Sequence, residues 1–345
     1  MKAVKAIRTP GGLSLRFDPR SVVVSLLLTA VTVAAGVVLI GSGDFPISPG
    51  EVVATLLGNG TQAQEFIVQD LRLPRVLVGL LVGASLALSG AIFQSISRNP
   101  LGSPDVIGFG QGATVGALTV IVLFDGGALA VAGGAVVGGL VTGVGVYVLA
   151  WKRGVHGYRL VLVGIGIAAM LTAVNHYLVT KASLVEATQA TLWMTGSLDG
   201  RDWAQVWPLL GVFAAVVPLI LAHGRPLRML EMGDDAAYAL GVPVERTRLV
   251  LMGSGVLLIA VATAAAGPIA FVALSAPQLA RRLTRSPGPN LAAASVMGAA
   301  LLLIADWAAT TGFGDRQLPV GVVTGVLGGC YLLWLLVTER KAGRI

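Results

Sequence analysis

The amino-acid sequence predicts an all-α membrane protein with about ten transmembrane helices in one domain. Of its 345 residues 55% are hydrophobic and only 12% are charged, and the mean hydropathy is +0.83. Soluble domains carry about 25% charged residues. Apolar runs of about 20 residues, each long enough to cross a bilayer core of about 30 Å, recur along the chain. The 46 glycines fit this class too, because small residues let helices pack closely in lipid.

The predicted spans are ten apolar windows separated by polar connections. They fall at about 21–41, 73–95, 103–124, 128–150, 160–180, 204–222, 249–266, 268–284, 291–312 and 318–338. We expect residues 1–20 to form a cytoplasmic segment, 21–338 a single transmembrane domain and 339–345 a cytoplasmic tail. The windows at 103–124 and 268–284 contain Gly or Pro near their ends, so we expect short or kinked helices there.

The orientation follows from the basic residues in alternate connections. One set of connections, which includes both termini, holds 19 lysines and arginines, and the other set holds the remaining 5 of the 24. Basic loops stay in the cytoplasm. Both termini are therefore predicted to be cytoplasmic, which requires an even number of spans, and the acidic stretch 41–70 faces outside.

The sequence offers no usual nucleotide or metal motif. None of the five lysines follows a glycine, so the Gly-Lys-Ser/Thr loop that cradles phosphates is missing. The three histidines lie far apart without acids or Cys at ligand spacing, and we expect no metal site. Cys330, the single cysteine, cannot form a disulfide within the chain. The net charge of +7 comes without a basic patch interleaved with aromatics, so no nucleic-acid partner is expected.

Few ionisable residues lie inside the windows. Asp306 is a clear interior acid, and Asp105 lies nearer a window boundary. Ion-coupled transporters place several ionisable groups within the hydrocarbon layer, so this pattern weakens that class of function but leaves it open. We expect Asp306 to be a structural anchor paired across helices, with a substrate ligand as the alternative.

The cytoplasmic segment 229–248, called the coupling segment below, is predicted to contain a short helix. Asp234 or Asp235 can cap the helix start, Gly241 suits a left-handed stop, and Pro243 prevents continuation. An ordinary loop helix and a docking element for a partner protein remain equally open.

Three extracytoplasmic arginines oppose the charge bias. Arg72 and Arg75 lie just outside the second window, and Arg316 lies just outside the tenth. Contact with lipid headgroups and docking of an acidic partner through carboxylates both explain them.

Four longer motifs resemble the FecCD family of iron-siderophore and vitamin B12 importer permeases. They occupy residues 70–75, 83–94, 98–108 and 318–322. The resemblance covers nearly the whole chain after about the first twenty residues. Residues 98–108, 196–200 and 230–235 are also similar to the ferric enterobactin permeases within this family.

The resemblance implies a type II ABC importer permease fold in the cytoplasmic (inner) membrane. Two permease subunits, a heterodimer in preference to a homodimer, would be embedded in membrane lipid. Two ATPase subunits would bind ATP and Mg²⁺ inside, and a siderophore-binding protein would dock outside. This chain would then be a transport subunit with no catalytic site or cofactor of its own. Its cargo would be a ferric siderophore, with an enterobactin-like catecholate favoured; a vitamin B12 or haem importer and an ion-coupled secondary transporter are the alternatives.

The resemblance also assigns site residues. Arg72, Arg75 and Arg316 would receive acidic residues of the binding protein. The ATPase would contact Glu231, Gly233, Asp234, Asp235, Leu240, Gly241 and Val242. Asn99 and Leu101 would lie at the cytoplasmic gate. Gln278 stands where many relatives have His, so a pH-sensing role at that position does not transfer.

Overall fold

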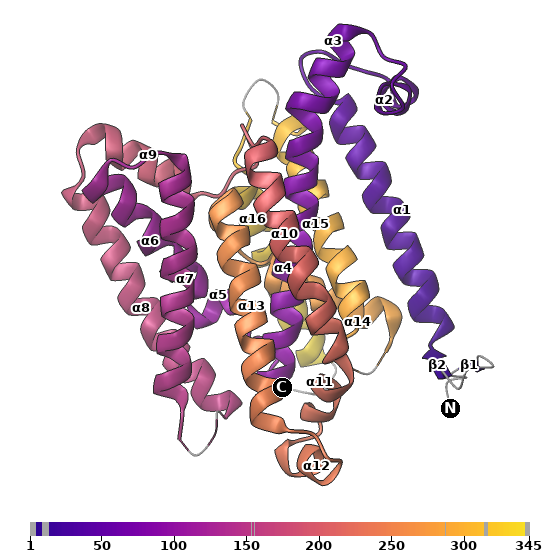
Figure 1. Cartoon of the computed structure of the whole chain (residues 1–345), viewed down its shortest axis with the longest axis vertical. Helices are drawn as coiled ribbons and strands as arrows, with labels where there is room; N and C mark the ends of the chain where they lie inside the picture. Colours follow the sequence, from indigo (N-terminus) through magenta and orange to yellow (C-terminus); the bar gives the residue numbers. More distant parts are fainter. Residues whose placement is uncertain are drawn as a thin grey trace.

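The computed structural model describes residues 5–8, 14–152, 154, 156–286, 288–313 and 317–341. Most of them are helical, and the long helices run side by side along the long axis of the molecule (Figure 1). Among the described residues, the β-strands form a short antiparallel hairpin of β1 (Lys5–Arg8) and β2 (Ser14–Phe17). The predicted helical class is therefore correct apart from this hairpin in the N-terminal segment.

Each of the ten predicted windows contains helix. The helices are α1 (Pro19–Gly41), α4 (Leu73–Ser97), α5 (Pro104–Ile107), α6 (Phe109–Phe124), α7 (Ala128–Ala150), α8 (Gly157–Lys181), α10 (Trp203–Ala222), α13 (Val244–Ala266), α14 (Val272–Thr284), α15 (Leu291–Thr311) and α16 (Val320–Lys341). Within the described residues, seven helices are long and apolar enough to cross a membrane, and two more are apolar but shorter. The chain is thus a multi-pass membrane protein.

The windows at 103–124 and 268–284 contain short or interrupted helices, as predicted. Gly108, whose φ is +92°, separates the four-residue α5 from α6. The window at 268–284 begins with a non-helical stretch, and its helix α14 has only 13 residues. In both places Gly or Pro breaks the backbone hydrogen-bond pattern where neighbouring helices surround it.

The connections carry short helices at both ends of the bundle. One end holds α2 (Pro49–Leu56), α3 (Gln62–Glu65), the π-helix η1 (Phe66–Arg72) and α9 (Leu184–Met194). The other end, at which α1 begins, holds α11 (Gly224–Leu230) and α12 (Asp234–Ala239) (Figure 1).

Helix α4 lies in the core of the molecule. It is buried over most of its length, as expected for a helix that is apolar on all sides. Glycine makes this position possible: a Cβ on Gly90 would overlap the Ala273 carbonyl of α14, and one on Gly83 would overlap the Gly298 carbonyl of α15. Helices α13, α14 and α15 pack around α4.

Helices α5–α9 form a second bundle beside this core (Figure 1). Its centre is the pair α6 and α7, whose backbones meet at four glycines, Gly112, Gly116, Gly134 and Gly138. We call this contact the glycine seam. Helix α13 packs against both α6 and α7 and joins the two bundles.

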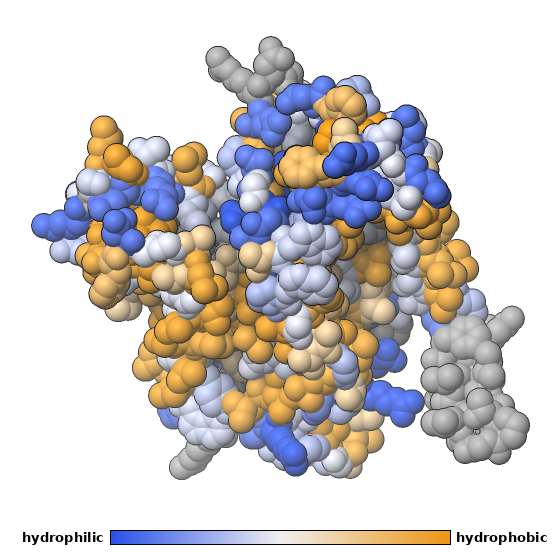
Figure 2. Space-filling model, turned by 45° about the horizontal axis from the view of Figure 1, so that its top comes forward, coloured by the Kyte–Doolittle hydropathy of each residue, from blue (hydrophilic) through white to orange (hydrophobic). Residues whose placement is uncertain are grey.

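The surface shows the pattern of a protein that lies in a bilayer. Hydrophobic residues dominate the flank of the molecule, and hydrophilic residues gather at the end that carries α2 and α3 (Figure 2). Large apolar residues on α1, α7, α8 and α16, such as Leu26, Leu149, Met170 and Leu333, are exposed. In a bilayer such residues face lipid or other membrane helices.

Candidate functional site

Arg72, at the end of the bundle that carries α2 and α3, holds the connection after α1. Its guanidinium donates to the Ile40 carbonyl (2.7 Å) and to the Phe45 carbonyl (2.9 Å). Gly43, with φ of +124°, lies against the same guanidinium. The half-buried Arg72 side chain therefore ties two backbone carbonyls of this connection together.

Arg75 forms a bidentate ion pair with Asp306 of α15. Arg75 Nε and Nη2 donate to the two Asp306 carboxylate oxygens at 3.0 and 2.9 Å, and Nη1 reaches Asp199 at 3.4 Å. Asp306 is 1% exposed, Arg75 19% and Asp199 76%. The pairing of Asp306 across helices is present as predicted, and its partner was not foreseen. Arg316, the third predicted docking residue, lies outside the described residues.

The coupling segment forms the predicted short helix. The expected cap by Asp234 or Asp235 is wrong: Gly233 (φ +114°) is the N-cap, no side chain among the described residues caps the helix, and both acids lie in its first turn. Gly241 (φ +79°) follows α12 in the left-handed region, as expected. Asp234 accepts from the buried Arg248 of α13 at 2.9 Å, and the same guanidinium donates to Glu245 at 3.0 Å. Sequence reasoning missed Arg248, because its spacing from Asp234 is not a helical one.

The other residues predicted to contact the ATPase divide into exposed and inward-facing ones. Asp235 and Leu240 are exposed, whereas Val242 is buried against the chain. Glu231 points inward: its carboxylate accepts from Ser95 of α4 at 2.7 Å and from Arg281 of α14 at 2.8 Å. Glu231 therefore fastens the coupling segment to two core helices.

The predicted gate residues lie in a tight turn that we call the mouth turn, residues 98–103. Arg98 ends α4 with a left-handed φ of 51°. The Asn99 side chain accepts from the Leu101 amide at 2.9 Å, and the Gly102 amide donates to the Asn99 carbonyl at 3.0 Å. Leu101 is exposed at the tip of the turn. Asn99 thus shapes the turn that presents Leu101.

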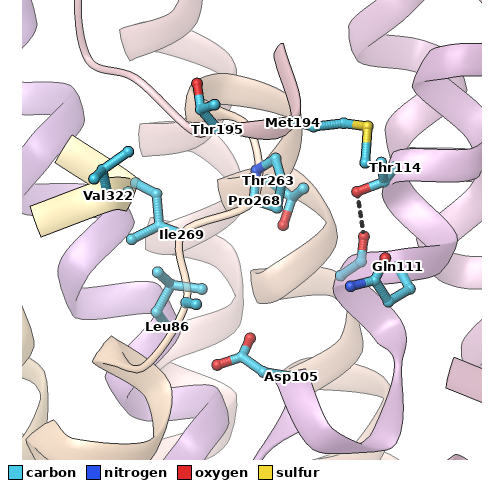
Figure 3. A pocket seen from close by; sticks show the side chains of 13 residues that line it. Leu86, Asp105, Gln111, Thr114, Met194, Thr195, Thr263, Pro268, Ile269 and Val322 are labelled. Atoms are coloured by element: carbon cyan, nitrogen blue, oxygen red, sulfur yellow. Dashed lines mark hydrogen bonds between the residues drawn. The ribbon is translucent and has the colours of Figure 1, made fainter. Parts of the chain in front are cut away.

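A cavity of about 350 Å³ opens between the two bundles. The side chains of Asp105, Gln111, Thr114 and Thr263 project into it, and apolar residues such as Ile269 complete its wall (Figure 3). One carboxylate oxygen of Asp105 is buried and has no hydrogen-bond partner in the described part of the chain. The sequence places Asp105 near a window boundary but predicts no role for it.

Metal-binding side chains do not converge in the part of the chain that the structure describes. Groups of three or more His, Cys, Asp or Glu side chains placed to hold a metal ion are absent among these residues. The polar groups of the described sites are instead organised in pairs and small hydrogen-bonded clusters, which join helices to one another.

Comparison with known proteins identifies the family. Residues 26–338 match the FecCD transport family. The ferric enterobactin transport system permease protein FepG of Escherichia coli (strain K12) is 48% identical over 322 residues, which cover 93% of this chain and 98% of that protein. The achromobactin transport system permease protein CbrC of Dickeya dadantii (strain 3937) is 36% identical, covering 91% of this chain and 90% of that one.

A solved structure has the same fold. It shows a metal-chelate type ABC transporter in an inward-facing conformation, and its chain superposes with a TM-score of 0.81 at 27% sequence identity, covering 92% of this chain and 99% of that chain. The match of nearly the whole chain in sequence and in structure leads to one conclusion: this protein belongs to the FecCD transport family.

Proposed function

We propose that the chain is the permease subunit of an ATP-driven importer that carries a ferric siderophore, of the catecholate type, across the inner membrane. The observation that carries this proposal is the 48% identity with a ferric enterobactin permease over nearly the full length of both chains. The family match over residues 26–338 includes the mouth turn and the coupling segment, so cargo handling and energy coupling are expected to be similar.

The proposed assembly contains this chain, a related second permease, two ATPase subunits and an extracytoplasmic siderophore-binding protein. Each permease crosses the membrane ten times with both termini in the cytoplasm. Ten apolar windows and the distribution of basic residues support this topology. ATP and Mg²⁺ are bound by the ATPase subunits, so this chain contributes movement and a pathway but no catalysis.

The proposed mechanism is alternating access driven from the cytoplasmic side. The loaded binding protein docks on Arg72, Arg75 and Arg316, and the closing ATPases push on the coupling segment. The mouth turn, with Asn99 and Leu101, then changes the access of the pathway to the cytoplasm.

Transport by reconstituted vesicles tests the function. The four-subunit importer and its binding protein are supplied with ferric enterobactin labelled with radioactive iron, with vitamin B12 and haem as competing cargos. We expect uptake against a gradient that requires both ATP and the ATPase subunits. Uphill uptake without the ATPase would establish an ion-coupled transporter, and uptake of vitamin B12 or haem alone would overturn the cargo assignment.

Affinity for the binding protein tests the docking arginines. Opposite charges across an interface attract less as salt increases, so docking should weaken between low and high ionic strength. Replacing Arg72, Arg75 and Arg316 by Glu should abolish docking, whereas Lys181→Glu, a charge reversal on the same side of the membrane, should leave it intact. Docking that is insensitive to salt and survives the triple reversal would refute the assignment.

A further inference from the structure

Helix α14 carries two polar side chains, Gln278 and Arg281, that reach two different cytoplasmic features of the chain. They lie three residues apart, so they share one face of the helix and are separated by about 4.5 Å along its axis. The partners of Arg281 belong to the coupling segment and to α4, and the partners of Gln278 belong to the mouth turn and to α16.

The Arg281 end of this arrangement is a closed cluster of three groups. Arg281 Nη2 donates to Glu231 Oε1 at 2.8 Å and to Ser95 Oγ at 2.9 Å, and Ser95 Oγ donates to Glu231 Oε1 at 2.7 Å. Hydrogen bonds between charged groups are about twice as strong as neutral ones. A displacement of Glu231 therefore pulls on α14 directly.

The Gln278 end uses both halves of the side-chain amide. Gln278 Nε2 donates to the Pro100 carbonyl at 2.7 Å, and Gln278 Oε1 accepts from the Tyr331 hydroxyl at 3.2 Å. The side chain is buried, so a lost partner would not be replaced freely by water. Pro100 lies between Asn99 and Leu101, so this bond attaches the mouth turn to α14.

We propose that α14 is the lever that carries movement of the coupling segment to the mouth turn, with Arg281 and Gln278 as its two positioning residues. The inference rests on the proposed importer function. One helical turn separates the two contacts, so the stretch between them is short and stiff. A push on Glu231 moves Arg281, and the same movement of α14 shifts Gln278 and the Pro100 carbonyl. A second contact between the mouth turn and the coupling segment exists, because Arg98 lies beside Gly233. The variants described below do not change this contact.

The decisive variant is Gln278→Leu, which keeps a similar volume but removes both hydrogen bonds. The importer is reconstituted in vesicles with its ATPase and binding protein, and ATP hydrolysis and uptake of ferric enterobactin are measured together. We expect hydrolysis to persist while the amount of cargo imported per ATP falls about five-fold, because one hydrogen bond biases the position of the turn by about that factor. Vesicles loaded with cargo should also leak in the absence of ATP.

Two further variants separate transmission from stability. Gln278→His keeps one ring N–H donor and one ring nitrogen acceptor, and it should restore the uptake per ATP. Thr284→Val removes a hydroxyl whose partners among the described residues are carbonyls within α14, and it should transport like the wild type. Combined with Glu231→Gln, Gln278→Leu should add little further loss, since both changes interrupt one route.

The outcomes are decisive in both directions. Unchanged uptake per ATP in Gln278→Leu would overturn the lever, and so would a loss that Gln278→His fails to rescue. A parallel fall of hydrolysis and uptake in Gln278→Leu would overturn it as well. Failure of the proposed function is recognised separately, because the wild-type importer would then show no ATP-dependent uptake of ferric enterobactin at all.

Discussion

Replacing Asp306 by Ala should destabilise the protein by about 3 kcal/mol. The carboxylate is 1% exposed and accepts two charge-assisted hydrogen bonds from Arg75. Removal of one partner from a buried ion pair costs about 3–5 kcal/mol. We expect the low end of that range, because Arg75 is 19% exposed and keeps Asp199 at 3.4 Å.

Denaturant titration in detergent micelles, followed by tryptophan fluorescence, measures this loss. Asp306→Asn keeps a carbonyl acceptor for one of the two bonds and should cost about 1.5 kcal/mol. Asp199→Asn is the matched control: its carboxylate is 76% exposed, so the change should cost at most about 0.5 kcal/mol.

The double variant Arg75→Met with Asp306→Leu provides the sharper comparison. Apolar residues that replace both members of a buried pair often restore stability, so we expect it to unfold within about 1 kcal/mol of the wild type. A single Asp306→Ala loss below about 1 kcal/mol would refute the reasoning, as would a double variant no more stable than that single one. The double variant also removes the guanidinium from a folded protein, so its binding-protein affinity tests the proposed docking role of Arg75.

Three other changes have expected outcomes. Gly90→Ala should lower the free energy of unfolding by about 3 kcal/mol in the same titration, because the added methyl overlaps a carbonyl of α14. Its control, Gly166→Ala, has open space around the added methyl and should leave the stability unchanged or raise it. Arg248→Met should lower hydrogen-exchange protection of α12 about ten-fold, since Asp234 loses its anchor. Arg72→Met should speed protease cleavage of residues 41–48 about five-fold, since two carbonyls lose their donor.

Each of these outcomes has a clear contradiction. Equal stability of Gly90→Ala and Gly166→Ala would mean that α4 and α14 are not in close contact. Unchanged exchange in α12 after Arg248→Met would mean that the ion pair does not hold the helix. Arg72→Met cleaved at the wild-type rate would show that the connection after α1 is held by other contacts.

The sequence predicts where helices form but not which of them are buried. The spans containing α1 and α4 have similar mean hydropathies, 2.7 and 2.3, yet 22% of the α1 window and 83% of the α4 window are buried in the structure. Lipid and protein interior are both apolar, so hydropathy does not distinguish them. The long runs, the breaks near Gly108 and Pro268 and the helix after Gly233 were predictable because local backbone chemistry decides them.

The sequence does not predict which charged side chains pair with one another, because the pairing depends on tertiary packing. Asp306 was expected to pair across helices, but its partner Arg75 is 231 residues away. Glu231 was placed on the surface that meets the ATPase, whereas the structure turns its carboxylate toward Ser95 and Arg281. A charged residue in a cytoplasmic connection looks alike whether it faces a partner or its own chain, so only the packed structure separates the two cases.

The glycine seam determines where the molecule can bend. With hydrogen in place of side chains, α6 and α7 touch backbone to backbone at four positions, which leaves no space between the two helices for either to tilt into. Bending is therefore shifted to the join between this stiff block and the core, and the cavity of Figure 3 takes walls from both. A tilt of the second bundle relative to the core would therefore change the width of this cavity.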